Sequence, residues 1–258
     1  MSQIGRLFGF TDKTQNPERS RMIPHTVKSY EAELEVLDKK IAQMGGLAEH
    51  NLAQAFEALQ KRDPRLADMV IAADGAIDAL EKDIEQQVIL MIARRQPMAS
   101  DLRHVVAALR ITSDLERIGD LAKNIAKRAN AIADEAHPKP VITGLGHMVE
   151  MSLKQLKMVL DAYAERDAAR ALEVWRNDQQ IDAMYNSLFR ELLTYMMENP
   201  RNIGISTHLL FGAKNLERVG DHTTNIAETI HYLVTGQTVT EKRPKSDETS
   251  TTLHQQDE

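Results

Sequence analysis

A charged segment occurs twice in this sequence, and its residue types suit metal binding better than core packing. The segment L-E-R-I-G-D-L-A-K-N-I-A runs from Leu115 to Ala126 and returns as L-E-R-V-G-D-H-T-T-N-I-A from Leu216 to Ala227. Eight of the twelve positions are identical, including a glutamate, an arginine, an aspartate and an asparagine. Many apolar sequences of the right volume can satisfy a core, so the repetition of particular charged residues indicates chemistry.

Each copy of the segment carries two acids one helical turn apart, and a second acid pair with the same spacing precedes it. Residues four apart on a helix share one face. If two helices fold antiparallel about Pro97, Asp74 lies level with Asp120, and Asp78 lies level with Glu116. The sequence therefore predicts two quartets of carboxylates, which are Asp74, Asp78, Glu116 and Asp120 in the first copy and Asp178, Asp182, Glu217 and Asp221 in the second.

Four neighbouring carboxylates cannot all stay ionised without a cation or protons. A ligand set made only of oxygen selects hard ions, so we expect Mg²⁺, Mn²⁺, Ca²⁺ or oxidised iron, bound singly or as a multinuclear cluster. A lone acid pair on a helix is usually just solvated, but two mirrored quartets favour a metal site. The acids lie off the apolar stripes of their helices, which predicts an outer groove between two helices rather than a buried cavity.

Other polar residues of the repeated block could support such a site. The asparagines could supply a carbonyl ligand or hold a carboxylate, or be ordinary surface residues. For the arginines we favour bracing of the carboxylates over anion binding or plain surface ion pairs. A glycine costs about 1 kcal/mol in a helix interior, so Gly119 and Gly220 indicate close helix approach or room for the site. The supporting residues are Arg117, Asn124, Arg218 and Asn225.

The composition predicts an all-α protein that positions these residues on helices. Helix-forming residues dominate the 258 positions, aromatic residues make up only 4%, and the 12 glycines and 8 prolines are sparse. The absence of cysteine excludes disulfides, zinc-thiolate sites and iron-sulfur clusters. The net charge of -6, with acids and bases interspersed, argues against nucleic-acid binding. No signal sequence or membrane span is apparent, so we expect a cytoplasmic location.

Apolar periodicity and proline positions predict two tandem, pseudo-symmetric three-helix bundles. The proline-containing linker Asp134 to Pro140 separates them. Six helices are expected, over about 26–61, 64–95, 100–133, 141–165, 168–197 and 202–235. The predicted organisation is a flexible N-terminal arm over 1–24, a first bundle over 25–135, a second bundle over 138–235 and a disordered tail over 236–258.

Catalytic signatures are missing from the sequence, so we do not expect an enzyme. It lacks the two E-x-x-H motifs that together hold di-iron centres in helical bundles, and it has no phosphate-cradling glycine-rich loop and no Ser-His-Asp order. One alternative is a carboxylate-bridged multinuclear metal enzyme, a hydrolase or an oxidase. A second alternative is a scaffold whose acid quartets bind nothing.

The chain closely resembles the PhoU family over about His25 to Thr235. The resemblance rests on the E-R-[IV]-G-D-x-x-x-N-I block, the D-x-x-x-D on the neighbouring helix, the segment R-Q-P-M-A-S-D-L-R from Arg95 to Arg103, and the duplicated three-helix plan. In that family two E(D)xxxD motifs per half bind metal clusters on the surface of a two-bundle protein. The resemblance therefore implies the same eight acids as metal ligands.

The resemblance also implies a function in phosphate homeostasis. Members of the family are thought to link the ATPase-driven phosphate ABC transporter with the phosphate-sensing histidine kinase, and to repress phosphate uptake and the phosphate-starvation regulon when phosphate is plentiful. We therefore expect a homodimer that meets the membrane only through partner proteins and does not bind nucleic acid. The N-terminal arm looks longer than the family's core needs.

Overall fold

The computed structural model describes residues 19–241, with side chains from Ser29 onward, and all regular structure in this part is helical. The all-α prediction is confirmed. No helix in the described range is both long and apolar enough to cross a bilayer. The elements are α1 (Arg19–Lys61), α2 (Pro64–Arg95), α3 (Ser100–Ala131), α4 (Lys139–Glu165), α5 (Ala168–Asn177), α6 (Gln179–Glu198), the short 3₁₀ helix η1 (Pro200–Asn202) and α7 (Ile203–Thr235).

The turns that open α2 and α5 use the same local chemistry in both halves. The Asp63 carboxylate accepts hydrogen bonds from the backbone N–H groups of Arg65 and Leu66, at 3.0 and 3.2 Å. Asp167 caps α5 in the same way, with bonds of 2.9 and 3.0 Å. Such caps satisfy N–H groups that have no partner inside the helix. The duplication of the sequence therefore extends to the hairpin turns.

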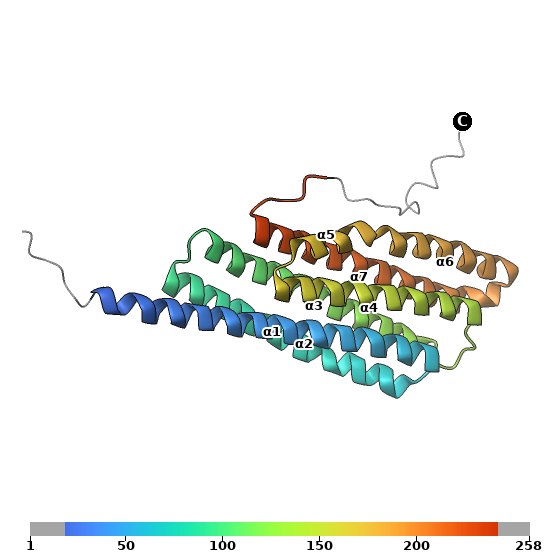
Figure 1. Cartoon of the computed structure of the whole chain (residues 1–258). Helices are drawn as coiled ribbons and strands as arrows, with labels where there is room; N and C mark the ends of the chain where they lie inside the picture. The colour runs from blue at the N-terminus through green and yellow to red at the C-terminus, as the bar shows by residue number, and fades with distance from the viewer. Residues whose placement is uncertain (1–18, 242–258) are drawn as a thin grey trace, which may run out of the picture.

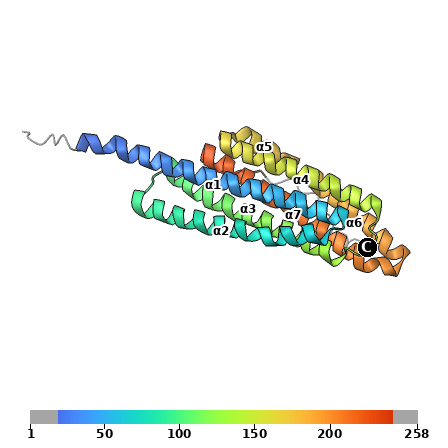
Figure 2. The ribbon, with the colours of Figure 1, turned by 90° about the horizontal axis from the view of Figure 1, so that it is seen from below.

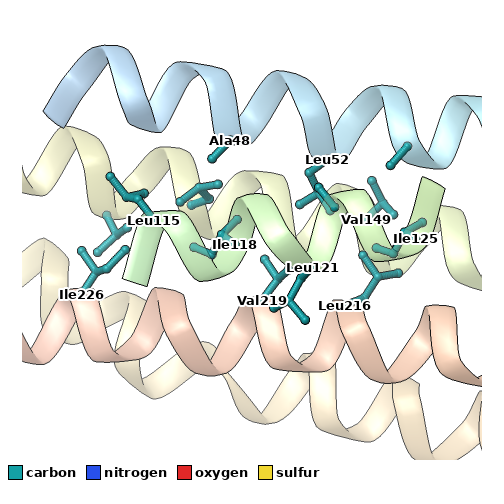
Figure 3. Packing of buried hydrophobic residues seen from close by; sticks show 14 of the residues in the cluster. Ala48, Leu52, Leu115, Ile118, Leu121, Ile125, Val149, Leu216, Val219 and Ile226 are labelled. Atoms are coloured by element: carbon teal, nitrogen blue, oxygen red, sulfur yellow. The ribbon is translucent and has the colours of Figure 1, made fainter. Parts of the chain in front are cut away.

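The two halves pack through equivalent helices and share one hydrophobic core (Figure 1). Figure 3 shows α3 and α7 running antiparallel at the centre, with Leu115 of α3 near Ile226 of α7 and Ile125 near Leu216. The other equivalent pair, α1 and α4, also packs antiparallel, because Gly45 lies against Leu160 while Phe56 lies against Gly146. The molecule is therefore a pseudo-symmetric double bundle, with α2 and the α5–α6 pair on its outer sides (Figures 1 and 2).

The N-terminal part of α1 differs from the prediction. The helix begins at Arg19 and continues through Pro24, so residues 19–24 are helical rather than part of a flexible arm. A proline near a helix end removes only one backbone hydrogen bond, which a helix of 43 residues can accommodate. This part of α1 projects beyond the other helices (Figure 2). The predicted arm over 1–18 and most of the predicted tail, 242–258, lie outside the described residues.

The predicted single helix 168–197 is divided at Asp178 into α5 and α6. The backbone tightens there, because the N–H of Ile181 bonds to the Asp178 carbonyl three residues back, at 3.0 Å. The side-chain amide of Gln155 in α4 donates to the Asn177 carbonyl, at 3.2 Å. A partner from another helix thus replaces the usual helical bond at the interruption. One of the predicted metal ligands therefore lies at the break between two helices.

Candidate metal centres

The first carboxylate cluster lies between α2 and α3, at the level predicted from antiparallel pairing. Asp74 is buried, and its carboxylate accepts a hydrogen bond from Lys123 Nζ at 2.5 Å. The same ammonium group lies 3.5 Å from an oxygen of Asp120. Because Lys123 reaches acids on both helices, the structure brings Asp74 and Asp120 together around a positive charge.

The other two acids of the first cluster lie one turn along the same helices. Burial and the negative charge of Asp120 raise the pKa of Glu116, and the charges of Glu81 and Asp78 act in the same direction. Arg117 opposes this rise, since it contacts Glu116 at 3.4 Å and Asp120 at 3.5 Å. Asp78 and Glu116 are therefore close enough to interact electrostatically, and the geometry of Arg117 is that of a side chain that holds two carboxylates.

The second cluster, between α7 and the start of α6, is more deeply buried. Asp178, Asp182 and Glu217 are 1%, 3% and 5% exposed, and Asp221 is partly buried. Lys214 contacts one oxygen of Glu217 at 2.9 Å, but the other oxygen, Oε2, is buried with no hydrogen-bond partner. Burial is the main cause that raises the pKa of Glu217, and the charges of Asp221 and Asp182 add to it.

The repeated glycines make room for these carboxylates. A Cβ atom placed on Gly220 would lie 3.0 Å from Asp178 Oδ1, and one on Gly119 would lie 2.8 Å from Ile77 Cδ1 and 3.6 Å from Asp74 Oδ1. Contacts near 3.0 Å or below force a neighbour to shift. The glycines therefore permit both close helix approach and the position of the first aspartate of each D-x-x-x-D.

The expected outer groove is wrong for half of the acids. Asp74, Asp178, Asp182 and Glu217 are buried, whereas Asp78, Glu116, Asp120 and Asp221 are only partly covered. Helical periodicity predicted the direction of each side chain, but it did not predict the neighbouring side chains that contact the acids, such as Lys123 at Asp74 and Lys214 at Glu217. Each cluster therefore has a buried floor and a partly exposed rim.

The remaining predicted residues lie at the edges of the clusters. Arg218 is exposed and Asn124 is partly buried. Asn225 donates a hydrogen bond to Asp114 of the first half, at 3.3 Å, where His222 also contacts Asp114 at 2.9 Å. Asn225 therefore takes part in a contact between the two halves.

The donor chemistry of both clusters fits a hard cation. All eight predicted ligands are carboxylates, which bind Mg²⁺, Mn²⁺, Ca²⁺ and oxidised iron. Within residues 19–241, no three histidine, aspartate or glutamate side chains are arranged as a ready set of metal ligands. In their place, lysines supply the positive charge, and Glu217 Oε2 remains a buried acceptor without a donor. The residues fit a cation once the lysine side chains move aside.

Sequence reasoning missed Lys123, Lys214 and Glu81. A signal was available for the two lysines, because Lys123 follows Asp120 by three positions and Lys214 precedes Glu217 by three, so each shares a helix face with its acid. Glu81 likewise follows Asp78 by three positions.

A separate polar cluster joins the two halves away from the carboxylate quartets. Tyr163 donates to Asp38 Oδ1 at 2.5 Å, Arg166 donates to Asp38 Oδ2 at 2.8 Å, and His104 contacts Asp38 at 2.8 Å. Burial alone would raise the pKa of Asp38, but the hydrogen bonds from His104 and Tyr163 and the positive charges of His104 and Arg166 lower it overall. This cluster links α1 and α3 to α4.

Together, the fold and the clusters define a class of duplicated helical-bundle proteins with one acidic cluster between helices in each half. The family model described as the PhoU domain matches residues 41–129 and 145–230. The chain belongs to the PhoU family.

The chain is similar to named members of this family along most of its length. It is 52% identical over 227 residues to the phosphate-specific transport system accessory protein PhoU homolog of Rhizobium meliloti (strain 1021), covering 88% of this chain and 96% of that protein. The homolog of Caulobacter vibrioides (strain NA1000 / CB15N) is also 52% identical, covering 88% of this chain and 98% of its own length.

Solved structures of the family share the fold. PhoU from Pseudomonas aeruginosa aligns with a TM-score of 0.78 at 39% identity, covering 81% of this chain and 100% of its own. The phosphate transport system regulatory protein PhoU from Streptococcus pneumoniae aligns with a TM-score of 0.75 at 30% identity, covering 82% and 100%. The predicted family and fold are therefore confirmed.

Proposed function

We propose that this protein is a metal-binding, cytoplasmic regulator of phosphate homeostasis that represses phosphate uptake and the phosphate-starvation regulon. The regulatory assignment is supported by the relatives, which are named as accessory or regulatory proteins of phosphate transport. In this proposal the protein is a homodimer that contacts both the ATPase of the phosphate ABC transporter and the phosphate-sensing histidine kinase. It acts as an adaptor and not as an enzyme.

One observation carries the metal part of the proposal. Glu217 places a buried oxygen without a hydrogen-bond donor in a cluster that also contains Asp178 and Asp182, both almost fully buried. Leaving a charged acceptor unsatisfied costs stability, and such groups usually have a role. A bound cation would neutralise the charge of the cluster.

The position of the clusters suggests how metal occupancy could reach a partner. Each cluster joins an outer helix to a central one, since Asp74 and Asp78 belong to α2 whereas Glu116 and Asp120 belong to α3. The central helices α3 and α7 pack on each other. A change in the distance between an outer and a central helix therefore alters the outer surface while the packing of α3 on α7 stays in place. In this proposal partner binding depends on metal occupancy.

The test measures binding of the full chain to the isolated transporter ATPase and, separately, to the kinase. Protein loaded with manganese should bind at least one partner more tightly than protein stripped with a chelator. The combined variant, with Glu116, Asp120, Glu217 and Asp221 all replaced by alanine, should bind as the stripped protein does. Glu173→Gln, an exposed carboxylate of α5, serves as the matched control. Equal partner binding by loaded, stripped and variant protein would refute the metal-dependent part of the proposal. Absence of binding to both partners would refute the adaptor role.

A further inference from the structure

A cavity of about 390 Å³ lies between α3, α7 and the residues that follow α7. Its walls carry charges of both signs, from Arg110, Asp114 and Glu228. Thr238 and Val239, in the segment after α7, cover one side. The volume is in the range of sites that bind small molecules, and the eight acids of the carboxylate clusters do not line it.

The cavity exists where the two halves of the sequence differ. At the pseudo-symmetric place on the other side of the α3–α7 pair, Arg128 stacks on Phe211, with its Cζ atom 4.8 Å from the ring centre. The repeat puts Thr229 at the position of Arg128 and Arg110 at the position of Phe211. Thr229 is 7% exposed and is much shorter than an arginine. The exchange therefore leaves a space that the other side fills.

Arg110 presents a positive charge to this space. Its Cζ atom lies 5.8 Å from the centre of the Tyr232 ring, a cation–π contact that holds the side chain. Among the described residues Arg110 forms no ion pair. Two turns earlier on the same face of α3, Arg103 has a buried Nε without a hydrogen-bond partner. The fork of an arginine matches a phosphate or a carboxylate, and the hydroxyls of Ser113 and Thr238 in the same cavity can donate to further oxygens.

The two acids of the cavity are held in place, and each keeps one oxygen available. Asp114 is contacted by His222 at 2.9 Å and by Asn225 at 3.3 Å, in both cases through Oδ1. Glu228 accepts a hydrogen bond from Trp175 through Oε1, at 2.8 Å. The second oxygens of these carboxylates are acceptors that suit the hydroxyl groups of a ligand. The cavity therefore offers donors for an anionic group and acceptors for hydroxyls beside it.

We propose that this cavity binds a sugar phosphate, either as a free compound or as the ribose phosphate of a nucleotide. Arg110 and Ser113 donate to the phosphate, and Asp114 and Glu228 accept hydrogen bonds from the sugar hydroxyls. Binding at this place does not require metal in the carboxylate clusters. Because α3 and α7 both line the cavity, a bound ligand connects the two halves of the molecule.

The test is calorimetry of the full-length protein in the presence of a chelator, so that phosphate cannot bind through a metal ion. The probes are ribose 5-phosphate and AMP, and ribose and inorganic phosphate represent the separate parts. Ribose 5-phosphate should bind at least about tenfold more tightly than either part, because the phosphate and the hydroxyls both contribute. Tighter binding of AMP than of ribose 5-phosphate would identify a nucleotide as the ligand, and equal or weaker binding of AMP a free sugar phosphate.

Two variants locate the binding. Arg110→Gln should weaken binding at least about tenfold, because it removes charge-assisted hydrogen bonds to the phosphate. Thr229→Arg introduces the residue of the other half and should abolish binding by filling the cavity. Arg65→Gln, an exposed arginine of α2, is the matched control and should bind as the wild type does.

Either of two results would overturn the proposal. One is that neither ribose 5-phosphate nor AMP binds more tightly than inorganic phosphate. The other is that Arg110→Gln binds these probes as the wild type does. If circular dichroism shows that Thr229→Arg does not fold, the exposed position of Arg110 still allows Arg110→Gln to decide.

Discussion

Replacing Glu217 by glutamine should stabilise the metal-free protein while weakening its metal binding. The Glu217 side chain is 5% exposed, one of its oxygens contacts Lys214 at 2.9 Å, and the other has no hydrogen-bond partner. Burial raises the pKa of this carboxyl. Glutamine keeps the shape of the side chain, removes the buried charge and gains an N–H₂ group that can donate to the neighbouring carboxylates Asp182 and Asp221.

The size of the effect follows from two opposing terms. Relief of an unsatisfied buried acceptor gains about 1–3 kcal/mol, and the loss of charge in the bond to Lys214 removes roughly 1 kcal/mol of this gain. The expected net gain in unfolding free energy is about 1 kcal/mol, which raises Tm by about 2–4 °C for a protein of this size. With metal at one hundred times its Kd, the wild type gains about 2.7 kcal/mol per site, so the order of stability should reverse.

The assay is thermal unfolding of wild type and Glu217→Gln, each in chelator and in excess manganese, with Glu173→Gln as the control. Glu217 has a raised pKa in the folded state, so its ionisation costs stability only as the pH rises above the ordinary value of 4.5. The advantage of the metal-free variant should therefore be present at neutral pH and disappear below pH 4.5. The reasoning would be refuted if metal-free Glu217→Gln melts below the metal-free wild type at neutral pH and manganese raises the Tm of both proteins equally.

Two further predictions concern the contact between the halves and the glycine next to the second cluster. Asp38→Asn should lower the unfolding free energy by about 1.5–3 kcal/mol in denaturant titrations at pH 7, because it weakens charged hydrogen bonds. Because the pKa of Asp38 is lowered in the folded state, this stabilisation is present above the ordinary pKa of 3.8 and is lost as the pH falls below it. Equal unfolding free energies of wild type and Asp38→Asn at pH 7 would contradict a stabilising role of the Asp38 hydrogen bonds. Gly220→Ala places a methyl group 3.0 Å from Asp178 Oδ1 and should reduce manganese binding in calorimetry. Gly75→Ala meets nothing within 4 Å and should raise the unfolding free energy by about 0.5–1 kcal/mol without changing metal binding, so equal metal binding by the two alanine variants would contradict the predicted crowding.

Much of the fold could be predicted because the sequence contains the relevant signals locally. Proline and aspartate at Asp63–Pro64 and glutamine and proline at Gln96–Pro97 mark the hairpin turns, and the apolar periodicity gives the helices between them. The position of the Gln96–Pro97 turn then sets which acids of the two neighbouring helices lie level with each other. The contact of Lys123 with both Asp74 and Asp120 confirms that antiparallel register.

The features that could not be predicted depend on contacts between distant segments. The break at Asp178 involves a hydrogen bond from Gln155 of another helix. The burial of the carboxylates depends on which long side chains fold over them, and helical periodicity does not specify this. The link between Asp38 and Arg166 likewise has no local signal, because it exists only after the two halves pack together.

The central claim is that the two carboxylate clusters bind metal, and the metal content of stripped and reloaded protein tests it most directly. Wild type reloaded with manganese or iron and analysed by mass spectrometry should retain bound metal. Glu116→Ala/Asp120→Ala should retain only the metal of the second cluster, about half of the total. Glu217→Ala/Asp221→Ala should retain only the metal of the first cluster, and the combined variant should retain none. A correctly folded combined variant that holds as much metal as the wild type would contradict the account.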